Sequence, residues 1–270
     1  MGSAAALAAS SALAPSTSVA ASPAGRTLTL GVASYSTRKF TLDQTLEMAK
    51  ALGVTSMTFK DVHIPRTGTP DATRVLREKI VAAGITIMGG GTITLPNDPA
   101  EIRRNFEYAK AAGFPLIFTS PDPAALDTIE QMAKEYDIKV AIHNHGPEDK
   151  LYPSPVNVYD HIKGLDNRMG LCLDIGHAAR AGANPVEVIG KYGNRIFDLH
   201  IKDLSEIAVK SRPIELGRGV LDIPGVIKAL AKNRYPGYCS IEHEMDMTDP
   251  LPGIAESAGY FRGVVKGESY

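Results

Sequence analysis

The chain alternates, eight times from Thr27 onward, between a short apolar run of the strand type and a longer segment with helical spacing. The apolar runs cover residues 27–34, 55–60, 85–89, 116–120, 139–143, 169–174, 196–201 and 238–242. Most are apolar throughout, which is typical of strands buried on both faces of a parallel sheet. Eight strand-helix units in about 245 residues favour an α/β fold of the closed (β/α)8 barrel type over a doubly wound sheet of eight strands.

Helix start and stop signals lie between these runs. The segments Thr41-Leu-Asp-Gln44 and Asp98-Pro-Ala-Glu101 each combine a capping residue with a polar side chain three positions later, which predicts two helix starts. Glycines at positions 53, 84 and 113 follow helical segments and predict where they end. We therefore expect residues 27–270 to form one catalytic barrel domain.

Residues 1–26 differ from the rest of the chain, since no charged residue precedes Arg26. The segment 4–14 has the apolar character of a signal-peptide core, and residues 18–22 are small, as signal peptidase requires, although a basic stretch before them is missing. We predict an unfolded leader over 1–26, which implies a periplasmic or secreted protein. The alternative is a low-complexity linker on a cytoplasmic protein.

Composition excludes several classes of protein. Lys and Arg total 29 against 30 Asp and Glu, which argues against a nucleic-acid partner. No apolar run is long enough to predict a membrane span. The two cysteines, Cys172 and Cys239, are too few and too far apart for a disulfide scaffold or a paired-cysteine zinc site. A small-molecule partner is expected, and the outer helices leave a homo-oligomer open.

Polar residues gather where the predicted strands end, and in barrels of this type that rim carries the chemistry. Six of the seven histidines lie there. Imidazole and carboxylate together are ligands for Mn2+, Co2+, Zn2+ or Fe2+. Asp174, His200 and Glu242 end three successive strands, so they are expected to converge on one divalent ion, with His143 or His145 as the fourth ligand.

Each of these residues also has a structural interpretation. Asp174 could cap the helix that follows it. His63 and His243 could be hydrogen-bonded core histidines. Lys60, Glu244 and Asp246 could be solvated charges, and Asn144 could brace its loop.

Four segments resemble the strand-six to strand-eight motifs of the xylose isomerase-like sugar isomerase/epimerase superfamily: 171–177 (LCLDIGH), 198–203 (DLHIKD), 215–222 (ELGRGVLD) and 240–242 (SIE). The resemblance implies a TIM barrel over residues 27–267 with one divalent ion. Its ligands would be an acidic residue after strand five together with Asp174, His200 and Glu242. His177 matches a family histidine that binds a substrate oxygen. The departure is His143, which stands where the ketose 3-epimerases have a glutamate.

That departure favours one reaction over another. Two-base epimerisation needs a carboxylate on each face of the sugar carbon, and Glu242 lacks the partner. The strand end His143-Asn-His145 and the segment 60–65 (KDVHIP) instead resemble the branch of inosose dehydratases and 3-keto-glycoside lyases or hydratases. We therefore predict a lyase or hydratase that acts beside the carbonyl of a keto-sugar or 3-keto-glycoside through an enediolate. The alternative is a sugar isomerase or epimerase with the same metal site.

The resulting assignment has two parts. The metal ligands are His143, Asp174, His200 and Glu242, which would hold one Mn2+, Co2+, Zn2+ or Mg2+ ion. The residues for proton transfer and substrate orientation are Lys60, His63, His145, His177 and Glu242.

Two other function classes share parts of this pattern. An endonuclease IV-like enzyme would need three metals and a basic DNA groove, and a non-catalytic sugar-binding barrel would have lost the ligands.

The glycine clusters at 89–91 and 217–219 are weak signals for phosphate binding, so an unphosphorylated substrate is favoured.

Overall fold

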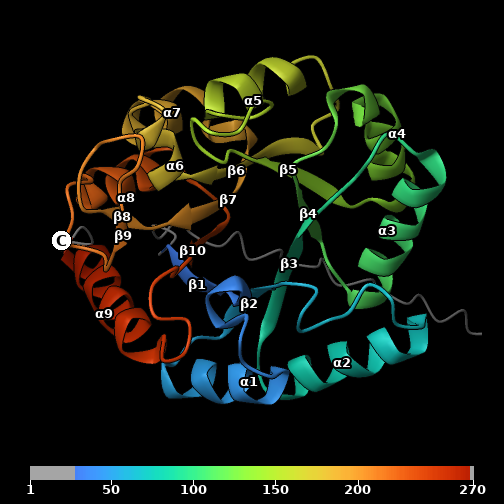
Figure 1. Cartoon of the computed structure of the whole chain (residues 1–270), viewed down its shortest axis with the longest axis horizontal. Helices are drawn as coiled ribbons and strands as arrows, with labels where there is room; N and C mark the ends of the chain where they lie inside the picture. Colours follow the sequence, from blue (N-terminus) through green and yellow to red (C-terminus); the bar gives the residue numbers. More distant parts are fainter. Residues whose placement is uncertain (1–27, 268–270) are drawn as a thin grey trace, which may run out of the picture.

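Eight parallel strands close into a barrel inside a ring of helices in the computed structural model, which describes residues 28–267 (Figure 1). The strands follow one another around the barrel in chain order, and the last pairs with the first. They are β1 Thr29–Ala33, β2 Ser56–Phe59, β3 Thr86–Ile93, β4 Leu116–Thr119, β5 Lys139–His143, β6 Met169–Asp174, β7 Ile196–Ile201 and β10 Tyr238–Ile241. The predicted (β/α)8 barrel is confirmed, and the doubly wound alternative is excluded. The predicted leader at 1–26 lies outside the described residues.

The helices cover the outside of the barrel (Figure 1). They are α1 Leu42–Ala51, α2 Pro70–Ala82, α3 Pro99–Ala112, α4 Leu126–Tyr136, α5 Pro155–Ile162, α6 Ile175–Arg180, α7 Pro185–Tyr192, α8 Ile223–Lys232 and α9 Leu251–Gly267. Three short 3-10 helices are η1 Ser34–Thr37, η2 Pro123–Ala125 and η3 Gly193–Arg195.

Local sequence explains where the helices begin and end. Thr41 and Gln44 form a reciprocal capping box at the start of α1, as predicted. Helices α2, α3, α5 and α7 each begin with a proline after a Thr, Asp, Ser or Asn cap, because a first-turn proline lacks only an N–H that has no helical partner. Gly113 ends α3 with a positive φ of 71°.

Three features differ from the prediction. Strand β3 continues to Ile93, four residues beyond the predicted end, because its glycines let the backbone pass close to the Phe114 and Phe118 rings. Two helices rather than one follow β6, so the described residues contain nine α-helices instead of eight. A hairpin of β8 Asp203–Leu204 and β9 Pro213–Ile214 follows β7, and strands of two residues leave no periodic signal.

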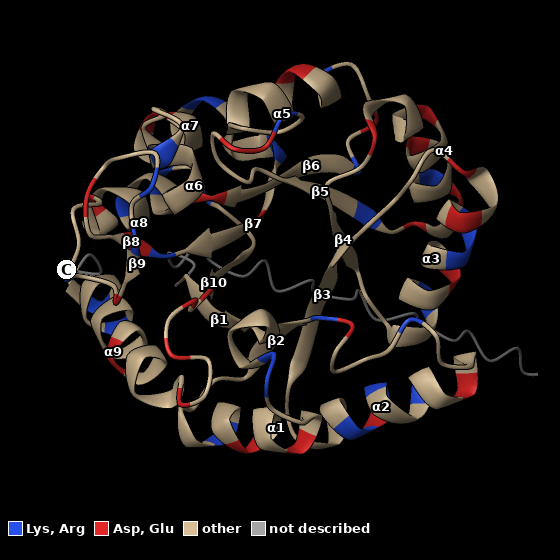
Figure 2. Cartoon of the chain, viewed as in Figure 1, with Lys and Arg blue, Asp and Glu red and all other residues tan. Residues whose placement is uncertain are grey.

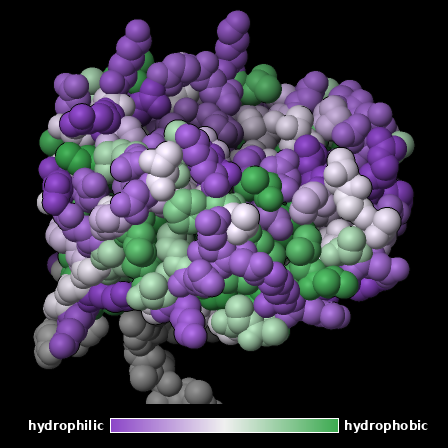
Figure 3. Space-filling model, turned by 60° about the horizontal axis from the view of Figure 1, so that its bottom comes forward, coloured by the Kyte–Doolittle hydropathy of each residue, from purple (hydrophilic) through white to green (hydrophobic). Residues whose placement is uncertain are grey.

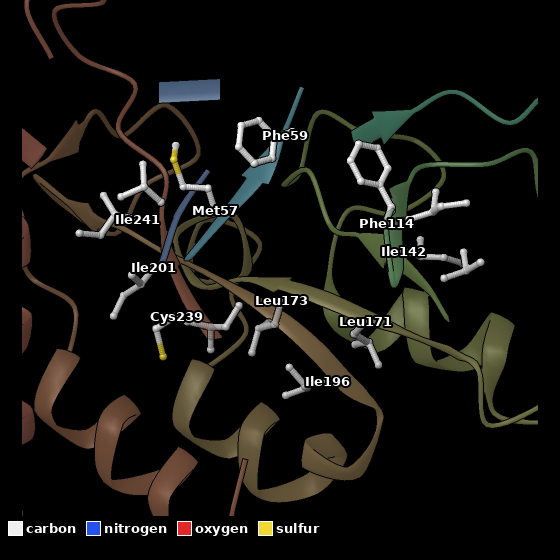
Figure 4. Close-up of a cluster of buried hydrophobic side chains, with 14 of the residues drawn as sticks. Met57, Phe59, Phe114, Ile142, Leu171, Leu173, Ile196, Ile201, Cys239 and Ile241 are labelled. Atoms are coloured by element: carbon white, nitrogen blue, oxygen red, sulfur yellow. The ribbon is translucent and has the colours of Figure 1, made fainter. Parts of the chain in front are cut away.

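The main core lies between the strands and the helices. Side chains alternate along each strand, so on β6 Leu171 and Leu173 join the core shared with the helices (Figure 4). Cys172, between them, belongs to a smaller cluster with Leu116, Phe118 and Ala141 inside the barrel. The barrel interior is therefore a separate layer, and polar side chains at the strand ends lie above it.

Charges of both signs are interspersed over the helices in Figure 2. On the face turned forward in Figure 3, apolar side chains are scattered among polar ones. Among residues 28–267, no helix combines the length and the apolar character that crossing a membrane requires.

Candidate metal centre and its cavity

A cavity of about 310 Å³ opens at the carboxyl ends of the strands. Its lining comes from the ends of all eight barrel strands or the segments that directly follow them. The residues are Ala33, Ser34, Tyr35, Thr58, Lys60, Gly91, Thr92, Phe118, His143, His145, His177, His200, Glu242 and Glu244. The barrel thus collects residues more than 200 positions apart in the chain into one site.

The four predicted ligands meet at one side of this cavity. Residues His143, Asp174, His200 and Glu242 each offer one ligand atom, and these atoms lie within 4.8 Å of one another. The Nδ1 atom of His200 lies 3.1 Å from His143 Nε2 and 3.3 Å from Glu242 Oε1. Parallel pairing sets this arrangement, because it places Asp174 beside His200 on the neighbouring strand. His143, rather than His145, is the strand-five residue in the cluster.

The two interpretations of Asp174 that the sequence left open are compatible with each other in the structure. Its Oδ1 accepts the His177 backbone N–H at 2.7 Å and caps α6. Its Oδ2 faces the cluster, 3.7 Å from His143 Nε2. Asn144 exchanges two hydrogen bonds of 3.0 Å with the Asp174 backbone, so it braces the ends of β5 and β6.

Lys202 is the main component that the sequence reasoning missed. The Lys202 side chain is 4% exposed, and its ammonium lies 2.9 Å from Asp174 Oδ2, 2.7 Å from Glu242 Oε2 and 2.8 Å from Glu244 Oε1. Its position two residues after His200 could have predicted this, because side chains two residues apart in an extended strand point to the same face of the sheet. A solvated loop charge was one interpretation of Glu244, but this side chain lines the cavity and pairs with Lys202.

The charges around the cluster favour a bound cation. Burial lowers the pKa of His143 well below its ordinary value, and the neighbouring His200 adds to the effect. Burial also opposes ionisation of Glu242, but the Lys202 ammonium and the His200 ring outweigh it and hold the pKa of Glu242 well below its usual range. The pKa of Asp174 falls to about 2, since His177, Lys202 and His143 outweigh its burial.

His200 lies between these groups. Burial would lower its pKa, but Cys172 and the Glu242 carboxylate outweigh burial and raise it well above the ordinary value. A positive charge is therefore favoured at the point where the ligand atoms converge. With His143 neutral, its ring offers a lone pair to a metal.

Two more predicted residues line the cavity beside the cluster. His145 Nδ1 lies 3.3 Å from the Asp149 carboxylate, and burial lowers the pKa of this ring. His177 Nδ1 lies 3.1 Å from an Arg180 guanidinium nitrogen. A guanidinium can only donate, so His177 Nδ1 accepts and its Nε2 carries the proton.

Lys60 lies across the cavity from the cluster. It follows β2, and in the order of strands around the barrel β2 is opposite β6, which carries Asp174. Its ammonium donates to the Thr92 carbonyl at 3.2 Å, which leaves two N–H groups for other acceptors.

Two of the six rim histidines are not in the cavity lining. His63, which was assigned to proton transfer or substrate orientation, is buried between hydroxyl groups, with Nδ1 3.0 Å from Ser34 Oγ and Nε2 3.1 Å from Thr45 Oγ1. His243 points toward α9, where its ring packs against Gly253. The structure therefore does not bring His63 together with the other predicted residues.

The two glycine clusters have structural partners. Asp203 is buried, and its carboxylate accepts the backbone N–H groups of Gly217 and Gly219 at 3.0 Å each. This loop thus surrounds an internal carboxylate. The glycines of β3 pack against aromatic rings, as noted above.

Comparison with known proteins links this geometry to one family. A family model described as xylose isomerase-like TIM barrel matches residues 123–264. The inosose dehydratase of Clostridium botulinum strain Alaska E43 is 30% identical over 165 residues, 54% of this chain and 51% of that protein. The rhizopine catabolism protein MocC of Rhizobium meliloti is 28% identical over 141 residues, 47% and 42% of the two chains. The matches thus span about half the length of these curated relatives.

Solved structures resemble the chain over most of its length. The IolI protein, whose crystal structure has a bound zinc atom, superposes with a TM-score of 0.72 over 90% of this chain and 99% of its own. The two sequences are 16% identical, so this likeness shows the fold.

Proposed function

Because the chain belongs to the xylose isomerase-like TIM-barrel family, we propose that it is a divalent-metal-dependent carbohydrate enzyme, a lyase or hydratase acting beside the carbonyl of a keto-sugar or 3-keto-glycoside. One observation carries the proposal. Four metal-type ligand atoms converge within 4.8 Å at one side of a cavity whose remaining wall holds His145, His177 and Lys60.

The residues at the cluster fit a divalent ion. Two imidazoles and two carboxylates form a mixed nitrogen and oxygen set, which suits Mn2+, Fe2+, Co2+ or Zn2+. When both imidazoles are neutral, as metal ligation requires, the three carboxylates and the one Lys202 ammonium leave a net charge of two negative units, which a divalent ion would neutralise. Held by these residues, such an ion would supply a Lewis acid for a substrate carbonyl oxygen and would offset the negative charge that develops there when the adjacent proton is removed.

His145 is suited to remove the proton beside the carbonyl. Its lowered pKa keeps the ring neutral near pH 7, so it can accept a proton. Asp149 attracts the N–H to Nδ1, which leaves the Nε2 lone pair as the base. His177 Nε2–H is the matching donor for a substrate oxygen, because Arg180 occupies the other nitrogen.

Lys60 is suited to protonate the leaving oxygen. An elimination needs an acid at the β-oxygen, whether that oxygen leaves as water or as an alcohol. The Lys60 ammonium lies across the cavity from the ligand cluster, and Thr92 holds it in place. A substrate between the two walls would meet the base from one strand end and the acid from another.

The position of Glu244 supports elimination over epimerisation. Glu242 and Glu244 both contact the Lys202 ammonium, so both carboxylates lie on the same side of the cavity. Epimerisation by two bases requires them on opposite faces of one carbon. The names of the relatives, inosose dehydratase among them, also support a dehydration step.

The test is an incubation of the metal-reconstituted protein with 3-keto-glucosides and inososes beside ordinary ketoses. Products are followed by mass and by exchange of the α-proton in D2O. Release of the aglycone, or a change by the mass of one water, is the expected result. Exchange at constant mass would support an isomerase or epimerase, and no change with any metal would overturn the proposal.

Export of the enzyme is a separate prediction. A reporter fused after residue 26 should reach the periplasm or medium if the first 26 residues act as a leader. A reporter retained in the cytoplasm would contradict this.

A further inference from the structure

A buried carboxylate lies below the ligand cluster, inside the barrel. Asp198 is on β7, two residues before His200, and is 1% exposed. Its neighbour across the sheet is Cys172, a member of the small interior apolar cluster. Ser240 Oγ donates to both carboxylate oxygens at 3.3 Å.

This carboxylate has a single charged neighbour at ion-pair distance. Within residues 28–267, His200 is the one basic side chain within 4.0 Å of Asp198, with Nε2 3.6 Å from Oδ2. A carboxylate buried without a cationic or hydrogen-bonded partner is strongly unfavourable. The buried Asp198 carboxylate therefore depends on two partners, the Ser240 hydroxyl and the His200 ring.

The two nitrogens of His200 face different surroundings. Nδ1 lies among the ligand atoms, 3.1 Å from His143 Nε2 and 3.3 Å from Glu242 Oε1. Nε2 faces Asp198, at a distance that a shift of about 0.5 Å would bring to hydrogen-bond length. The Cys172 sulfur also lies within 4.8 Å of a His200 ring nitrogen, so it is a competing partner.

We propose that Asp198 is a positioning residue for His200: its carboxylate accepts the Nε2–H, so that the Nδ1 lone pair points into the ligand cluster. An imidazole ligand whose second nitrogen donates to a carboxylate has a fixed tautomer and orientation and is a more basic ligand. The inference rests on the proposed metal site and concerns how this chain prepares one of its ligands.

The test combines nitrogen-15 NMR of the histidine rings with zinc affinity. Long-range proton-nitrogen spectra are recorded for the full chain without metal and with Zn2+, and His200→Gln assigns the His200 signals. In the wild type we expect a hydrogen-bonded proton on Nε2 in both states and zinc on Nδ1. Asp198→Val should lose that proton signal and weaken zinc binding 10- to 100-fold, the usual effect of losing such a partner.

Three variants separate positioning from general damage. Asp198→Asn keeps an acceptor of the same shape, so it should retain the Nε2 proton and lose less zinc affinity than Asp198→Val. Ser240→Ala removes the hydroxyl that hydrogen-bonds the Asp198 carboxylate and leaves the His200 ring unchanged. Cys172→Ala removes the competing partner of the His200 ring. Both should stay within threefold of the wild-type affinity, consistent with intact ligands.

The outcomes are distinguishable. A zinc-loaded wild type with its proton on Nδ1, or an Asp198→Val variant with unchanged zinc affinity, would overturn the inference. A proton signal that depends on Cys172 rather than Asp198 would overturn it as well. If the wild type binds no metal while the Nε2 proton still depends on Asp198, the pairing is upheld and the proposed metal function fails.

Discussion

Replacing Lys202 by methionine should strongly destabilise the metal-free protein. The Lys202 side chain is 4% exposed, and its ammonium lies within 2.9 Å of oxygens from Asp174, Glu242 and Glu244. Removing one partner of a buried ion pair leaves uncompensated charge and costs about 3–5 kcal/mol. Because the Glu244 side chain is 28% exposed and water can reach it, the lower end, about 3 kcal/mol, is expected.

The assay is thermal unfolding in a chelator and again with excess Zn2+. At about 2–4 °C per kcal/mol for a domain of this size, Lys202→Met should lower the Tm by roughly 6–12 °C. A divalent ion at 100 times its Kd stabilises the protein that binds it by about 2.7 kcal/mol. Zinc at that excess should therefore raise the Tm of Lys202→Met most of the way back to that of the metal-free wild type.

Lys60→Met is the matched control. This ammonium also belongs to the cavity but makes one hydrogen bond, to the Thr92 carbonyl, so about 1 kcal/mol or less should be lost. If Lys202→Met in chelator melts within about 2 °C of the wild type, a stability difference of about 1 kcal/mol or less, the buried ion pair does not have the expected effect.

Four further outcomes are expected. Asp174→Ala should abolish zinc binding and turnover together, and turnover with bound zinc in this variant would disprove its role as a ligand. His145→Gln should lower kcat about 10²- to 10⁴-fold, which is the usual contribution of a general base, while its zinc affinity stays near that of the wild type. A loss of zinc binding in this variant would instead indicate that His145 is a metal ligand. Burial lowers the pKa of His63, so its contribution to the free energy of unfolding is present above the unfolded pKa near 6.5 and is lost as pH falls. Between pH 7 and pH 5, the free energy of unfolding measured by denaturant titration should therefore fall less in His63→Gln than in the wild type, and an equal fall would contradict this. Gly90→Ala should cost about 1–3 kcal/mol, because a Cβ there would overlap the Phe114 ring, and an unchanged denaturation midpoint would show that the ring can move away.

The strand positions and the clustering of the four candidate ligands were predictable for one shared reason. Both depend on patterns that are local in the chain: an apolar run, a polar residue at its end and a cap before the next helix. Asp174 illustrates this, because the same local geometry makes it the end of β6, the cap of α6 and a rim carboxylate. Once eight such units close into a barrel, parallel pairing brings their ends to one rim.

Which rim histidines face the cavity was not predictable from these patterns. His63 and His145 both follow strand ends, but one packs between Ser34 and Thr45 while the other faces the cavity. The direction of a side chain in a loop depends on the neighbours supplied by other segments. No local periodicity encodes those neighbours.

Lys202 shows the same division most clearly. From sequence it is a lysine after an apolar strand, a position that is usually solvated. In the folded chain it is enclosed by carboxylates that lie 28, 40 and 42 residues away. The positions of strands and helices, and the residues that lie at the strand ends, follow from short-range patterns that can be read in the sequence. The charge balance of the site arises only when barrel closure brings distant carboxylates to one ammonium, because Coulomb attraction is strong only at short distance and away from water.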